Sequence, residues 1–353
     1  MQVHLFQGIR YTRAVKPTVM RKILYLAALS GAAFFGMIFL TQISTTWATH
    51  ILEKRYPPPG RMVPVGDYKL QLYCFGAGSP TIIIEPGMGV DWVSWRLVIS
   101  KLLPTNRVCV YDRAGYGWSD PGPRPRTALL EARELHTLLL RAGVPPPYIL
   151  AAHSFGAYIA RIYASKFRDS LAGVVLVDPS QEDEPAFTGA VSSKSAGLRI
   201  SNIVDLIPPL GVQRLRRMYN GDKAIRGVLR DAPRFYRERY LIASSLTQLK
   251  FERNEFDSLS LTKAQVRETV FPRDLPLTVI TAMHMSAASN SQLSNEPNSV
   301  DRELQARLAH SSQLGRQVLA WSGHMVPLDE PELIVSAVED IIHPPTRPET
   351  ASR

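Results

Sequence analysis

One serine in this chain lies in a setting that could make its hydroxyl a nucleophile. The motif is Ala152-His153-Ser154-Phe155-Gly156, which follows the apolar run Tyr148–Ala152 and precedes a stretch of helical composition at 157–167. A strand, a sharp turn and a helix, in this order, are the context in which a G-x-S-x-G motif exposes its serine. The turn needs small residues two places before and after the serine. Gly156 is one, and Ala152 replaces the usual glycine. We therefore predict that Ser154 is a catalytic nucleophile.

The base that would activate this serine is predicted to be His324. A serine hydroxyl is a weak nucleophile unless an imidazole takes its proton and an acidic group orients that imidazole. The chain has eight histidines. His284 follows the run Leu277–Thr281 and is left unassigned. His324 follows the apolar run Gln317–Trp321, in a loop before a helix that Pro331 starts. This position at the end of a strand suits a general base.

Two carboxylates are candidates for the acidic group of a catalytic triad. Asp178 directly ends the apolar run Gly173–Val177, and a carboxylate at that place is costly to bury without a partner such as a histidine. Glu296 is the first carboxylate after the run Leu277–Thr281, but it is reached only through a longer loop. We favour Asp178 and keep Glu296 as the alternative acid.

These side chains must be positioned by strands that alternate with helices. Short apolar runs recur from Met62 onwards, and most are followed by Gly, Asp or Ser and then by a stretch with helical periodicity. The runs are Lys69–Phe75, Thr81–Glu85, Arg107–Tyr111, Tyr148–Ala152, Gly173–Val177, Leu277–Thr281 and Gln317–Trp321. This alternation predicts an α/β fold with a mostly parallel sheet and helices on both faces. In such sheets the chemistry lies at the carboxyl ends of the strands.

Four separated motifs carry a resemblance to a known family. They are the serine motif at 152–156, Glu85-Pro86-Gly87-Met88-Gly89, Tyr111-Asp112-Arg113-Ala114-Gly115-Tyr116-Gly117-Trp118-Ser119, and Ser322-Gly323-His324. In this order they resemble the α/β-hydrolase superfamily, over residues from about 62 to 343. The resemblance implies an α/β-hydrolase core at 62–178 and 275–343, with a helical lid inserted at 179–274 and a tail at 344–353.

The resemblance also implies an activity. A serine hydrolase of this kind would cleave an ester or a related carbonyl substrate through an acyl-enzyme, with the backbone N–H groups of Met88 and Phe155 as the oxyanion hole. Asp112 and Arg113 would tie together the loop beneath the site. No cofactor or metal is implied, and the expected substrate is a small apolar or lipid-like acyl compound. Two alternatives stay open: a non-catalytic binding protein of this fold, and a lyase or C–C hydrolase with the same triad.

The first part of the chain has the features of a membrane anchor. No charged residue occurs from Ile23 to Leu52, and about 20 apolar residues span a bilayer as a helix. We predict a transmembrane helix at 23–45, after a basic cytoplasmic segment at 1–22 and before a linker at 46–61. Because the more basic flank stays cytoplasmic, the catalytic domain is expected on the exoplasmic or periplasmic side. A cleaved signal peptide is the alternative.

The net charge of +10 is concentrated in two segments. Residues 1–22 contain five Lys or Arg and no acid, and residues 212–240 contain nine Lys or Arg and three acids, so the rest of the chain is close to neutral. The first segment is a topology signal, and the second lies in the predicted lid, where it would contact anionic lipid headgroups or only water. This distribution gives no reason to expect a nucleic-acid partner.

Two further features concern possible pairings. In the strand order of α/β hydrolases the second strand neighbours the fourth, so Cys74 and Cys109 would meet as a cross-strand disulfide in an oxidising compartment. Two buried free thiols are the alternative. Ala28, Ala32 and Gly36 recur every four residues in the membrane helix, a spacing that would permit a weak homodimer.

Overall fold

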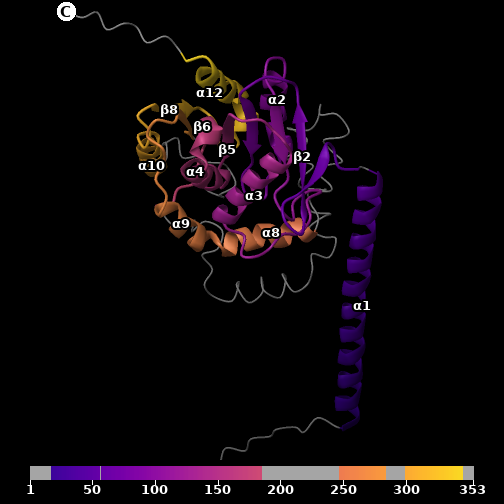
Figure 1. Ribbon diagram of the computed structural model, residues 1–353. Coiled ribbons are helices and arrows are strands. Elements are labelled where there is room, and N and C mark those ends of the chain that lie inside the picture. Colours follow the sequence, from indigo (N-terminus) through magenta and orange to yellow (C-terminus); the bar gives the residue numbers. More distant parts are fainter. Residues whose placement is uncertain (1–16, 56, 185–245, 284–298, 345–353) are drawn as a thin grey trace, which may run out of the picture.

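The computed structural model describes residues 17–55, 57–184, 246–283 and 299–344 (Figure 1). Eight strands form one sheet in the order β1-β2-β4-β3-β5-β6-β7-β8. They are β1 (Arg61–Pro64), β2 (Lys69–Phe75), β3 (Thr81–Glu85), β4 (Val108–Tyr111), β5 (Tyr148–His153), β6 (Leu171–Val177), β7 (Leu277–Ala282) and β8 (Gly315–Ala320). Strands β3 to β8 are mutually parallel, while β1 and β2 pair antiparallel with their neighbours. The predicted mostly parallel sheet is confirmed.

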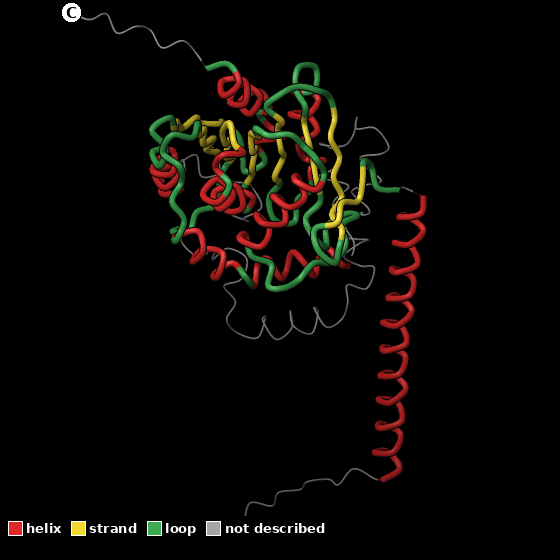
Figure 2. The backbone as a smooth tube through the Cα atoms, in the orientation of Figure 1, coloured by secondary structure: helices red, strands yellow, loops and turns green. Residues whose placement is uncertain are grey.

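Helices cover both faces of this sheet, and Figure 2 shows the strands gathered in the middle of the domain with helices around them. The helices of the domain are α2 (Arg96–Leu102), α3 (Ala128–Arg141), α4 (Gly156–Lys166), α8 (Leu246–Asp257), α9 (Leu259–Arg267), α10 (Ser299–Ala309), α11 (Val326–Asp329) and α12 (Pro331–Ile342). Two short 3₁₀ helices, Trp92–Trp95 and Arg168–Ser170, join them. The sheet therefore buries side chains on both of its faces.

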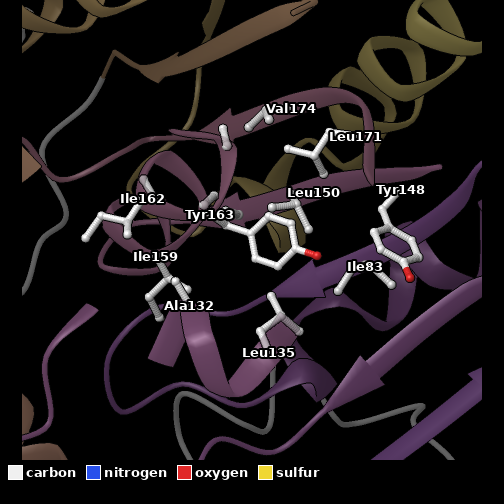
Figure 3. Close-up of a cluster of buried hydrophobic side chains, with 14 of the residues drawn as sticks. Ile83, Ala132, Leu135, Tyr148, Leu150, Ile159, Ile162, Tyr163, Leu171 and Val174 are labelled. Atoms are coloured by element: carbon white, nitrogen blue, oxygen red, sulfur yellow. The ribbon is translucent and has the colours of Figure 1, made fainter. Parts of the chain in front are cut away.

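Alternation along the strands separates two hydrophobic clusters. Ile83 of β3 and Leu150 of β5 pack with α3 and α4 on one face, as the close-up in Figure 3 shows. Their neighbours Ile82 and Ile149 pack with α2 and α12 on the other face. Successive side chains of a strand point to opposite faces, so a strand buried on both faces reads as a continuous apolar run. This explains why the strands could be found from unbroken apolar runs.

The N-terminal helix α1 (Pro17–Arg55) stands apart from the domain (Figure 1). Its 39 residues correspond to a length of about 58 Å at 1.5 Å per residue, which is longer than the helix predicted at 23–45. The predicted linker is helical as far as Arg55, because no Gly or Pro interrupts the chain between Gly36 and Pro57. The window Pro17–Met37 is long and apolar enough to cross a membrane, and none of it is buried. The residues Ala28, Ala32 and Gly36 are exposed on this helix.

Several predicted features lie outside the described residues. These are the alternative acid Glu296, the basic segment 212–240, most of the lid (185–245) and the tail beyond residue 344. In the described part of the segment predicted as a lid, α8 and α9 are helices near its C-terminal end.

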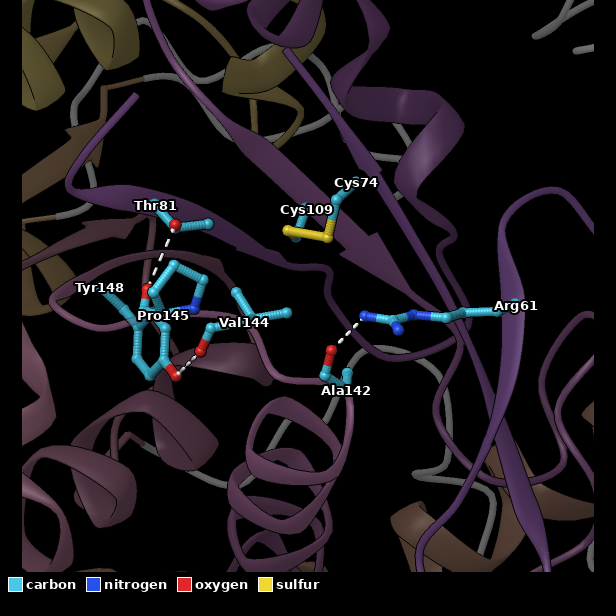
Figure 4. The surroundings of a disulfide bond; sticks show 8 residues. All are labelled: Arg61, Cys74, Thr81, Cys109, Ala142, Val144, Pro145 and Tyr148. Carbon is cyan, nitrogen blue, oxygen red and sulfur yellow. Dashed lines mark hydrogen bonds between the residues drawn. A yellow bond between two sulfur atoms is a disulfide. The ribbon is translucent and has the colours of Figure 1, made fainter. Parts of the chain in front are cut away.

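The structure joins Cys74 and Cys109 in a disulfide between β2 and β4 (Figure 4). The two residues are direct partners in the antiparallel register of these strands, and their Cα atoms are 4.0 Å apart. Cys109 is fully buried. The bond therefore fastens the antiparallel edge of the sheet to its parallel centre.

Removal of this disulfide is expected to destabilise the domain. Replacing both cysteines by alanine should lower the free energy of unfolding by about 3–4 kcal/mol, because the closed loop of 35 residues restricts the unfolded chain. Urea unfolding of the full chain in detergent measures this difference, and wild type treated with reductant should match the double variant. If both thiols of the native, unreduced protein can be alkylated, the disulfide is absent and the prediction fails.

Candidate active site

Ser154 occupies a sharp turn between β5 and α4. Its φ is 52°, in the left-handed region that residues other than Gly rarely adopt. Its backbone N donates to Val177 O at 3.1 Å, and its carbonyl accepts from Ala157 N at 3.0 Å. A side chain at Gly156 would place its Cβ 2.7 Å from Glu85 O. The strained turn is thus held by β6 on one side, and its close approach to β3 explains the glycine two places after the serine.

Asp178 follows β6 directly and also has a positive φ, of 39°. Its Oδ2 lies 2.6 Å from His324 Nδ1. Its Oδ1 accepts hydrogen bonds from Ala282 N at 3.2 Å and from Gln305 Nε2 at 3.1 Å. Burial raises the pKa of Asp178, but the hydrogen bond and charge of His324 outweigh it, so the pKa is lowered from its ordinary value. The carboxylate is therefore ionised and paired, as a buried acid must be.

His324 lies in the loop between β8 and α11, 146 residues from its partner Asp178. Burial disfavours its charged form, while the hydrogen bond and charge of Asp178 favour it, and the net effect raises the pKa of His324 above its ordinary value. If Nδ1 carries the proton that faces Asp178, the neutral ring has its lone pair on Nε2. An imidazole in that tautomer is a competent general base.

His153 connects this histidine to the serine turn. Its Nε2 lies 2.8 Å from His324 O, and the centroids of the two imidazole rings are 4.5 Å apart. Burial, together with the nearby His324, lowers the pKa of His153 to about 3. A neutral ring at this position donates to the His324 backbone without adding positive charge. The structure thus brings Asp178 and His324 to the strand ends beside Ser154.

The loop at residues 86–89, called the oxyanion loop below, lies against the same turn. A side chain at Gly87 would place its Cβ 3.2 Å from Ser154 Cβ. Met88 is the next residue of this loop, and Phe155 follows Ser154 at the N-terminus of α4. The two backbone N–H groups predicted for an oxyanion hole therefore come from segments on either side of the serine. The N-terminal end of a helix also favours negative charge nearby.

Two residues at the site have no counterpart among the sequence predictions. Gln305 of α10 holds Asp178, and Glu255 of α8 is a fully buried carboxylate that binds Arg113 beneath the oxyanion loop. Both are polar residues in helices of polar composition. Nothing in the local sequence distinguishes such residues from solvated ones, because their burial depends on what packs over them.

Comparison with known proteins identifies the family. Residues 82–337 match the alpha/beta hydrolase family, so the chain belongs to that family. An "AB hydrolase superfamily protein" of Gibberella zeae is 30% identical over 281 residues, covering 75% of this chain and 86% of the relative. An uncharacterized vacuolar membrane protein of Saccharomyces cerevisiae is 24% identical over 42% of this chain and 28% of its own length. The chain spans less than half the length of several other curated relatives that it matches.

Solved structures share the fold. Cfl2 from Burkholderia cenocepacia superposes with a TM-score of 0.58 at 22% identity, covering 79% of this chain and 94% of that one. The enol-lactonase from Burkholderia xenovorans LB400 gives a TM-score of 0.54 at 16% identity, covering 80% and 99% of the two chains. These likenesses establish the α/β-hydrolase fold, and membership of the family supports a hydrolase.

Proposed function

We propose that this protein is a membrane-anchored serine hydrolase that cleaves an ester or a related carbonyl substrate through an acyl-enzyme. The observation that carries the proposal is the 2.6 Å contact between His324 Nδ1 and Asp178 Oδ2, beside the strained turn of Ser154. A serine, a histidine and an acid are recognised as a catalytic triad by their geometry and roles rather than by their positions in the sequence, and acyl transfer is the reaction that such a triad supports. Here, the chain order of Ser154, Asp178 and His324 follows that of α/β hydrolases.

The proposed reaction has two halves. His324 Nε2 takes the proton of the Ser154 hydroxyl while Oγ bonds to the substrate carbonyl carbon, and the N–H groups of Met88 and Phe155 bind the resulting oxyanion. The bond to the leaving alkoxide then breaks, and the imidazolium gives that group its proton. Water repeats these steps on the acyl-enzyme, with His324 again as base, and releases the acid and the free serine. Asp178 stays ionised throughout and stabilises the imidazolium.

The alternatives differ in what they require of the site. Epoxide hydrolases and dehalogenases of this fold use a carboxylate nucleophile, whereas the turn here holds a serine. A non-catalytic binding protein needs neither the ionised Asp178 nor its contact with His324. A lyase or C–C hydrolase would use the same three residues, so only trials with substrates separate it from an ester hydrolase.

The proposed location rests on α1 and on the disulfide. The exposed apolar surface of α1 and its basic N-terminal flank favour a membrane anchor with the domain on the exoplasmic side. A disulfide between Cys74 and Cys109 persists in oxidising compartments, which agrees with that side. A small apolar or lipid-like acyl substrate would suit an enzyme held at a bilayer.

Covalent labelling tests the proposed nucleophile. Wild type is expected to react with a serine-directed fluorophosphonate, while Ser154→Ala should lose labelling completely, because the attacking oxygen is absent. Ser180→Ala is the matched control, since the backbone N of Ser180 donates to Ser154 O at 3.2 Å and the substitution keeps this hydrogen bond. In-gel fluorescence of the full chain in detergent provides the measurement. If the wild type is not labelled, the proposal that the protein is a serine hydrolase is wrong. If Ser154→Ala is still labelled, the nucleophile is another residue.

A further inference from the structure

Arg113 lies beneath the oxyanion loop with only 4% of its surface exposed. A guanidinium has five N–H donors, and each of the five has a partner here. Nη1 donates to Glu85 Oε1 at 2.9 Å and Pro86 O at 2.8 Å, Nη2 to Gly87 O at 3.0 Å and Glu255 Oε2 at 3.4 Å, and Nε to Glu255 Oε1 at 3.1 Å. The side chain is thus fixed by carboxylates on two sides and in turn holds two backbone carbonyls.

Those two carbonyls determine how the oxyanion loop is oriented. The Gly87 carbonyl belongs to the same planar peptide unit as the N–H of Met88, and this peptide bond is trans. In a trans unit the C=O and N–H groups point in opposite directions. Because Arg113 Nη2 holds Gly87 O, the Met88 N–H must point away from the guanidinium. A second donor to Gly87 O, the N–H of Val90, is longer, at 3.4 Å.

Tyr116, in the segment between β4 and α3, and Glu255, on α8, complete this arrangement. The hydroxyl of Tyr116 accepts from Gly89 N at 3.2 Å and donates to Glu255 Oε2 at 2.7 Å. Glu255 is fully buried on α8, within the segment predicted as a lid, and it also binds Arg113. The oxyanion loop is therefore attached at three backbone positions, Pro86, Gly87 and Gly89, to side chains that share one carboxylate.

We propose that Arg113 is a positioning residue that aims the Met88 N–H at the oxyanion of the reaction. This inference rests on the proposed hydrolase function and adds to it a residue that does not touch the substrate. A lysine has only three donors, on a single nitrogen, and cannot reproduce the planar fork that reaches two carbonyls and two carboxylates. Displacement of an oxyanion donor lowers turnover by about 10²-fold without weakening substrate binding.

Arg126 provides a matched control. It is also fully buried, and its guanidinium binds Glu131 and Glu134 of α3, with Nη2 to Glu134 Oε2 at 2.6 Å. Its hydrogen bonds go to these two carboxylates and to Pro123 O, not to the oxyanion loop. Arg126→Lys therefore removes a buried fork of the same kind and leaves the hydrogen bonds of the oxyanion loop in place. It also keeps a positive charge beside Glu131, whose Oε2 lies 3.9 Å from Arg113 Nε.

The test compares Arg113→Lys with Arg126→Lys in the full chain in detergent. With 4-nitrophenyl butyrate as probe, Arg113→Lys is expected to lower kcat about 100-fold while KM stays within about threefold. Its affinity for phenylboronic acid, which forms a tetrahedral anion on the serine, should fall by a similar factor. Hydrogen exchange of the peptide covering residues 85–90 should become faster. Arg126→Lys should show none of these three changes.

The outcomes separate this proposal from the proposed function. If the wild type is labelled and hydrolyses the ester, but both lysine variants lose kcat equally or the exchange of residues 85–90 does not change, Arg113 has no positioning role and the inference is wrong. A rise in KM without a fall in kcat would also overturn the inference. If the wild type neither reacts with fluorophosphonate nor hydrolyses the ester, the proposed hydrolase function is wrong, and Arg113 has no role in that catalysis.

Discussion

Asp178→Asn is expected to lower kcat/KM for 4-nitrophenyl butyrate by about 10⁴-fold and to leave the protein folded. The physical reason is the tautomer of His324. Asp178 Oδ1 accepts two hydrogen bonds, from Ala282 N and Gln305 Nε2. In the variant, the amide oxygen must take that position, so the amide nitrogen faces His324 Nδ1. Nδ1 then has to accept a hydrogen bond, which moves the ring proton to Nε2. Nε2 must be unprotonated to act as the base.

Two carboxylate variants serve as controls for this experiment. Asp329→Asn changes an exposed acid five residues after His324 and should leave kcat/KM within about twofold. Glu296→Gln tests the alternative acid and is expected to behave in the same way. Thermal unfolding of each variant shows whether a loss of activity reflects a loss of fold. If Glu296→Gln is the variant that loses activity while Asp178→Asn retains it, the assignment of the acid is wrong.

The sequence predicted the strands that position the candidate site, because each strand depends on a short stretch of chain. Ser154 and Asp178 directly follow β5 and β6, which are buried on both faces and visible as apolar runs, and His324 lies in the loop after β8. The lengths of these runs were nearly correct. The strand before Asp178 begins at Leu171 rather than Gly173, and Leu171 is itself buried.

What the sequence could not supply is the pairing of side chains from distant elements. Gln305 reaches Asp178 across 127 positions, and Glu255 reaches Arg113 across 142. Arg113 was expected to tie together the loop beneath the site, but the partners that give it a geometric role were not readable. The length of α1 was underestimated for a different reason, since the polar residues after Ile43 resemble a linker although no helix-breaking residue interrupts them.

The rate of fluorophosphonate labelling is expected to fall about tenfold per pH unit below the pKa of His324, and so about 100-fold over two units. His324 acts only in its neutral form. Its pKa is raised because the hydrogen bond and charge of Asp178 outweigh the effect of burial. The midpoint of the acidic limb should therefore lie above the ordinary histidine value of about 6.5. The measurement is the rate constant for labelling of the wild type at pH values from about 4.5 to about 9, a range chosen so that the protein stays folded.

The slope of this limb distinguishes one ionisation from two. His153 contacts the ring of His324, but its pKa of about 3 keeps it neutral throughout the range. Asp178, with a lowered pKa, stays ionised. Among these three residues only His324 titrates in the range, so the logarithm of the rate should change with a slope of one. Burial raises the pKa of Glu85 to about 7, against the opposing charge of Arg113. A slope of two would contradict the single-base mechanism, and it would mean that protonation of Glu85 disturbs the Arg113 side chain that holds the oxyanion loop.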